Sequence, residues 1–87
     1  MEVAVWDTYV TKTDGIVMHF DIIAPSHITD ENEIHAFGKE YLISKNQGHQ
    51  SLTAKECALC HLEQATDEMM ASIQQKGYYI VEMQNCK

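Results

Sequence analysis

The sequence contains no arginine, and its six basic residues are all lysines. There are 13 acidic residues, so the formal net charge is -7. Proteins that bind nucleic acids use clustered Lys and Arg to displace counterions, and anionic membrane surfaces attract the same residues. The lack of arginine also removes the bidentate grip on phosphate or carboxylate ligands. The composition therefore argues against a nucleic acid or a membrane as the partner.

Long apolar runs are missing as well. No segment has the length needed to cross a bilayer, and no apolar run of signal-peptide length is visible near the N-terminus, so we expect a cytoplasmic protein. A chain of 87 residues, 45% of them hydrophobic, is enough for one domain with a core and too short for two. The three cysteines are an odd number, which favours free thiols or metal ligands over a disulfide framework.

Strand signals dominate the first quarter of the chain. Residues 3–10 and 16–23 are rich in β-branched and aromatic side chains, which suit half-buried strands. An Asp-Gly pair between the two segments supplies the turn of a β-hairpin. Alternation along the second strand places His19 and Asp21 on the face opposite to its apolar residues.

Helix signals follow the hairpin. Asp30 and Glu33 form a capping-box pattern, and apolar residues then recur at helical spacing. Thr66, followed by two acidic residues, predicts the start of a second helix, and Gly77 predicts its end. A last strand is expected over residues 78–83, where aromatic and β-branched side chains recur.

A further Thr-x-x-Glu pattern, from Thr53 to Glu56, predicts a short helical turn that carries the Cys-x-x-Cys-His motif. The expected fold is a single α+β domain over residues 1–87. It combines a small, mainly antiparallel sheet, made of the N-terminal hairpin and the C-terminal strand, with two main helices and this turn. We expect the helices to pack on one face of the sheet.

The segment from Cys57 to His61 is the main chemical motif. Residues three and four apart share one side of a helical turn, so Cys57 would face Cys60 and His61. Two cysteines at this spacing are a common zinc half-site, and Cys86 with His19, His49 or His61 is a candidate for the other half. Covalent haem attachment uses the same spacing, but the lack of a visible export signal argues against haem. Thiol-redox chemistry and simple packing of buried thiols are the remaining alternatives.

A second candidate site is a polar cluster on the hairpin. His19 and Asp21 project from one strand face, and Asp7 lies across from them if the hairpin register allows it. One interpretation is an acid–base or metal site. The other is a solvated strand face with a hydrogen-bonded histidine, which we favour because exposed polar residues alternate in this way in any case.

Several short patterns, taken together, resemble those of one small bacterial family. They are Val5-Trp-Asp-Thr-Tyr-Val10, Gly15, Met18-His-Phe-Asp21, Cys57-x-x-Cys60-His61, Gly77-Tyr and a cysteine near the end. Over nearly its whole length the chain is similar to the domain of unknown function numbered two thousand and twenty-four. The resemblance implies a compact α+β domain without an assigned activity, substrate or cofactor.

Three classes of function follow from these observations. The preferred hypothesis is a non-enzymatic cytoplasmic domain whose candidate zinc ligands are Cys57 and Cys60 together with His61 or Cys86. The second is a small enzyme that uses either the thiols for redox chemistry or the histidine–aspartate face for acid–base chemistry. The third is a partner-binding or dimerising module, because a short sheet with open edges can add a strand from another chain.

Overall fold

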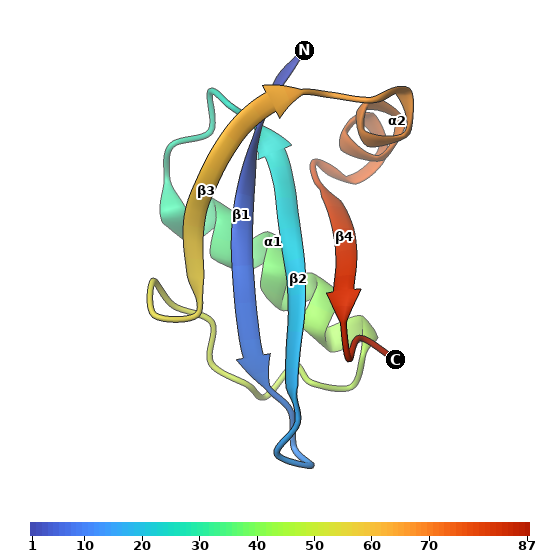
Figure 1. Cartoon of the computed structure of the whole chain (residues 1–87). Helices are drawn as coiled ribbons and strands as arrows, with labels where there is room; N and C mark the ends of the chain where they lie inside the picture. The colour runs from blue at the N-terminus through green and yellow to red at the C-terminus, as the bar shows by residue number, and fades with distance from the viewer.

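The computed structural model describes all 87 residues as a four-stranded antiparallel sheet with two helices (Figure 1). The elements are β1 (Glu2–Thr11), β2 (Val17–Pro25), α1 (Glu31–Ser44), β3 (Cys57–Gln64), α2 (Asp67–Lys76) and β4 (Tyr79–Gln84). The strand order is β3-β1-β2-β4, so the hairpin forms the centre of the sheet and β3 and β4 form its edges. The α+β class predicted from the sequence is confirmed. Neither α1 nor α2 has the length and apolarity that a membrane-spanning helix requires.

The sheet face covered by α1 holds the larger of two apolar cores. Phe20 and Ile22 of β2 are fully buried there, in one cluster with Ile34 of α1. Burying side chains of this size contributes about 1.5–3 kcal/mol each. The helix starts as the sequence predicts, because the Asp30 carboxylate accepts a hydrogen bond of 2.9 Å from the Asn32 N–H.

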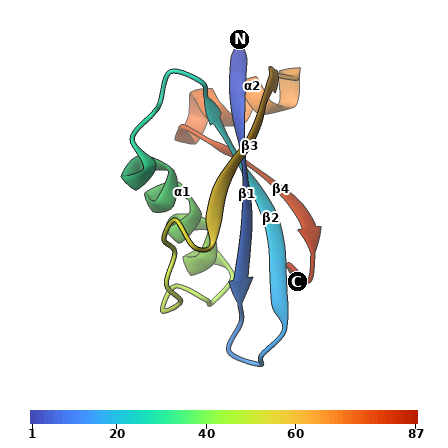
Figure 2. The same ribbon diagram turned by 60° about the vertical axis from the view of Figure 1, so that its left-hand side comes forward.

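On the opposite face, only the residues near the start of β1 are covered, by α2. Figure 2 shows α2 at this end of the sheet. Ile73 of α2 forms a second, smaller core there with Val3, Val5 and Ile23. The prediction that both helices pack on one face is wrong. The odd-numbered residues at this end of the hairpin are apolar, so a second helix is required to shield them from water. Gly77 ends α2 at φ 94°, the left-handed conformation expected of a helix terminator.

Residues 57–64 form the edge strand β3, where the sequence predicts a helical turn. The capping pattern does form, since the Glu56 carboxylate accepts hydrogen bonds of 2.8 Å from the N–H and the hydroxyl of Thr53. The turn closes with a bond of 3.1 Å from the Cys57 N–H to the Thr53 carbonyl, and the chain then pairs with β1. The helical prediction for the Cys-x-x-Cys-His motif is therefore wrong. Pairing with an open strand satisfies more backbone groups than one isolated turn.

Candidate functional site

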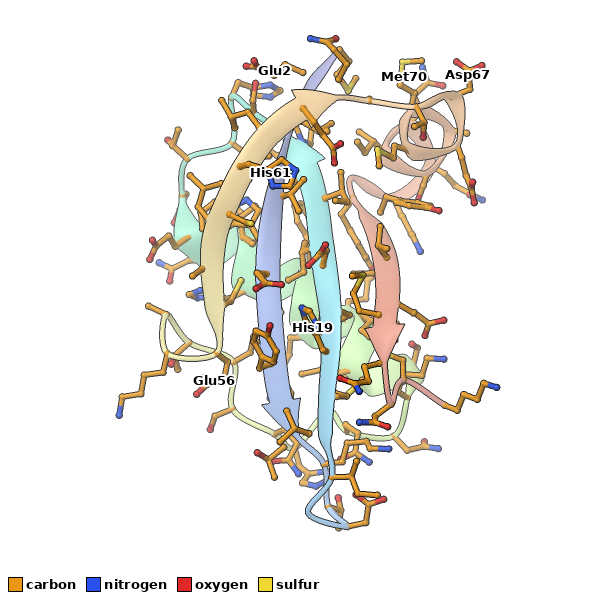
Figure 3. The ribbon with its side chains drawn as sticks, viewed as in Figure 1. Glu2, His19, Glu56, His61, Asp67 and Met70 are labelled. Carbon is orange, nitrogen blue, oxygen red and sulfur yellow. The ribbon has the colours of Figure 1, made fainter.

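The half of the second sheet face that α2 leaves open is polar. Odd-numbered positions of β1 and β2 place Asp7, His19 and Asp21 side by side in this region. Asp7 pairs directly with Asp21 across the hairpin, a register that the sequence left open. Figure 3 shows His19 near the middle of this open surface, well away from α2.

These three residues, which we call the Asp–His–Asp cluster, lie in close contact. The Nε2 atom of His19 is 2.5 Å from Oδ1 of Asp7 and 3.9 Å from Oδ1 of Asp21. One potential ligand atom from each residue lies within 4.8 Å of the other two. No other three His, Cys, Asp or Glu residues of the chain converge in this way. The structure thus brings together all three members of the polar cluster expected from the sequence.

The two carboxylates have different environments. The hydrogen bond with His19 is the main cause that lowers the pKa of Asp7. The pKa of Asp21 is raised to about 6, mainly by burial and then by the neighbouring Asp7 carboxyl. Oδ1 of Asp21 is buried and has no hydrogen-bond partner. The cluster therefore combines an excess of negative charge with one unsatisfied oxygen.

Tyr9 completes one side of the cluster. It pairs with His19 across the hairpin, and their rings stack with centroids 4.1 Å apart and planes 11° apart. Stacking restrains the orientation of the imidazole ring. Tyr9 was not predicted to belong to this site, although its position two residues after Asp7 on the same strand places it on the same face.

The four residues expected to bind zinc do not meet at one point. Cys57 is buried on the α1 side of the sheet at one edge, and it accepts a hydrogen bond of 3.4 Å from a threonine hydroxyl. Cys86 is buried beyond β4, the opposite edge, with its thiol directed at the backbone carbonyl of His19 at 3.2 Å. Cys60 is exposed and lies beside His61. The geometry gives no support to a zinc site that contains all four.

Cys57 also lacks the environment of an activated thiol. All three cysteines are free, and burial raises the pKa of Cys57. Redox-active cysteines instead have a lowered pKa and an electropositive, partly exposed setting. The thiol-redox hypothesis therefore receives no support from the environment of Cys57.

The Asp–His–Asp cluster lies on an open surface rather than in a cavity. Each of the five surface cavities is lined by other residues. A ligand would therefore approach the cluster directly from the solvent side of the sheet.

Comparisons with known proteins place the chain in a family. The family described as Domain of unknown function (DUF2024) matches residues 1–83. Among solved structures, the NMR structure of a Nitrosomonas europaea protein, a structural genomics target, is 39% identical, with a TM-score of 0.86 over 100% of both chains. A search of curated proteins gave no match. The resemblance seen in the sequence is confirmed, and the chain belongs to the DUF2024 family.

Proposed function

We propose that this protein is a metal-binding domain whose site consists of Asp7, His19 and Asp21. The observation that carries the proposal is the convergence of three potential ligand atoms within 4.8 Å on the open half of the sheet. Two carboxylates and one imidazole suit first-row divalent ions such as Mn²⁺ or Zn²⁺. We also propose a cytoplasmic location, which the three free thiols support.

The charges of the cluster favour a bound cation. Burial and the neighbouring Asp7 make ionised Asp21 unfavourable in the metal-free protein. A divalent ion would offset the repulsion between the two carboxylates and give the unsatisfied Asp21 oxygen a partner. Three protein ligands leave coordination positions on the solvent side, which water or a donor atom of a bound molecule can fill.

Proton transfer is a second candidate function. A carboxyl with a pKa of about 6 beside a hydrogen-bonded histidine–aspartate pair has the groups needed for general acid–base catalysis. We prefer metal binding because the cluster faces solvent rather than a cavity that would enclose a substrate.

Calorimetric titration of chelator-treated protein with Mn²⁺ tests the proposal. We expect one ion per chain, and affinity at least about tenfold weaker in His19→Ala, which removes a ligand, and in Asp21→Asn, which removes the charge of one. The matched control is His49→Ala, because His49 is exposed and contacts Thr13 and Gln50 rather than a carboxylate. Wild-type affinity in the His19 variant would contradict the proposed site.

A further inference from the structure

The edge strand β3 contains a β-bulge that changes which side chains share a face. Its register with β1 shifts, so that Leu59 pairs with Trp6 while Leu62 pairs with Ala4. Trp6 and Ala4 both belong to the core under α1. The two leucines therefore lie on the α1 side although they are three residues apart, which regular alternation would not allow.

The bulge places Cys60 and His61 together on the opposite side. The Cys60 Sγ atom is 3.4 Å from Nδ1 of His61, and Cys60 and the His61 side chain are both exposed. Figure 3 shows the His61 ring in front of the sheet, on the same side as His19. Tetrahedral zinc with ordinary Zn–S and Zn–N bond lengths separates two such ligand atoms by about 3.5 Å. The pair thus already has the spacing of two zinc ligands.

The second ring nitrogen of His61 lies near a carboxylate that can orient the imidazole. Nε2 lies 3.7 Å from Oε1 of Glu63. In protein metal sites a carboxylate near the outer nitrogen orients the imidazole and leaves the other nitrogen for the metal. Glu63 therefore favours Nδ1, the atom beside Cys60, as the ligand.

We propose that Cys60 and His61 form half of a zinc site that a second copy of this chain completes. A structural zinc takes four ligands, and no third Cys, His, Asp or Glu of the same chain converges on this pair. β3 pairs only with β1, so its other edge is free to pair with β3 of the second copy. Antiparallel pairing centred between Cys60 and His61 sets each Cys60 opposite a His61, which gives two thiolates and two imidazoles on one face.

This antiparallel pairing relates the two copies by a two-fold axis, and the axis also brings apolar side chains of the two copies together. It sets Leu59 of one copy opposite Leu62 of the other, on the α1 side of the joined sheet. In the single chain these leucines are 54% and 52% exposed, and they line a shallow groove together with Trp6. The Trp6 indole N–H is buried without a partner. One axis thus pairs leucine with leucine and cysteine with histidine, as a self-complementary dimer interface requires.

This association depends on zinc because only the metal–ligand bonds offset the repulsion between two acidic copies. Each copy carries a net charge of -7, so two copies repel one another. Binding of Zn²⁺ releases the two thiol protons, and the charge of the ion balances the two thiolates. We expect monomers after chelation and dimers with one zinc per two chains.

Sedimentation velocity in a buffer with a non-chelating reductant tests the proposal. The His19→Ala background removes the Asp–His–Asp cluster as a competing zinc site. Zinc should convert this protein from monomer to dimer, and the cobalt-loaded dimer should show thiolate-to-metal charge-transfer absorption. Cys60→Ser and His61→Ala should each abolish the zinc-dependent dimer, whereas His49→Ala should retain it.

A second variant separates the pairing of the strands from the metal ligands. Leu59→Lys keeps both ligands, and it should weaken the dimer because it places two lysines in the apolar half of the interface. Thermal melting confirms that each variant is folded, as the exposure of the three side chains leads us to expect. Monomers at every zinc concentration would overturn the proposal. So would a dimer that survives chelation, or one that is dissociated by reductant alone through loss of a Cys60 disulfide.

Discussion

Replacing Asp21 by asparagine should change the stability of the protein in opposite directions without and with metal. In the metal-free protein, folding raises the pKa of Asp21 from 3.8 to about 6. A carboxyl with a raised pKa contributes stability that is complete below pH 3.8 and is lost as the pH rises through about 6. At pH 7.5 the ionised Asp21 therefore opposes folding, and asparagine removes this opposition.

The expected change in the free energy of unfolding follows from the change in the pKa of Asp21 on folding. About two pKa units correspond to about 3 kcal/mol. The Asp21 side chain is 18% exposed, and water reduces the penalty, so we expect Asp21→Asn to raise the free energy of unfolding by about 1–2 kcal/mol. For a domain of this size that is a rise of roughly 4–15 °C in Tm.

Urea denaturation of both proteins at pH 7.5 and pH 4.5 measures the difference. The advantage of Asp21→Asn should shrink at pH 4.5, where folded Asp21 is mostly protonated. Saturating Mn²⁺ should reverse the sign, because the wild type gains binding free energy that the variant loses. Asp14→Asn is the matched control, since Asp14 is 57% exposed and its amide replacement can still accept the Ile16 N–H. Lower stability of Asp21→Asn in metal-free buffer at pH 7.5 would refute this reasoning.

Three further variants test the packing and the site. Cys57→Ser should lower the free energy of unfolding equally in zinc and in chelator, because the thiol is a buried, hydrogen-bonded core group. A loss of stability seen only in zinc buffer would instead make Cys57 a metal ligand. Gly38→Ala should lower the free energy of unfolding in urea by about 1 kcal/mol, because overpacking of about 1–3 kcal/mol exceeds a gain of about 1 kcal/mol in helix propensity. The new Cβ would lie 2.8 Å from Ile22 Cδ1 and closer still to Leu52 Cδ2, and a rise in stability would contradict this close packing. Tyr9→Ala should weaken Mn²⁺ binding in calorimetry by releasing the stacked ring of His19, and wild-type affinity would show that stacking does not position the ligand.

The hairpin and both main helices could be predicted because their signals are local. The N-cap side chains of Asp30 and Thr66 accept hydrogen bonds from the backbone of the first turn, as their capping patterns predict. The glycine that ends α2 stands at its predicted position because only a left-handed residue closes that turn cheaply. Each of these features depends on residues within one or two turns of one another.

The edge strand β3 could not be predicted because its cause is not local. The capping pattern of Thr53 and Glu56 forms as predicted, yet it governs only one turn. The structure of the next eight residues is decided by the open edge of β1. The bulge in β3, which brings Cys60 beside His61, also depends on this pairing. The Cys-x-x-Cys-His spacing therefore predicted Cys57, Cys60 and His61 on one side of a helical turn, whereas the strand places Cys57 on the face opposite to Cys60 and His61.

The open half of the sheet follows from the lengths of its elements. A helix of 10 residues, the length of α2, spans about 15 Å, whereas a strand of 10 residues, the length of β1, spans about 33 Å. α2 therefore cannot cover the whole face. A solvated face would account for polar residues there, and this was the preferred interpretation of the sequence.

Solvation does not account for the arrangement of the charges. Asp7 and Asp21 are direct cross-strand partners, and like charges in such positions destabilise a sheet. A face that only needed to contact water would be more stable with a neutral or oppositely charged residue at one of the two positions. His19 contacts Asp7, but it leaves the buried oxygen of Asp21 unsatisfied. A cation bound between the carboxylates would offset the repulsion and satisfy this oxygen, which is why we favour a metal site over a solvated strand face.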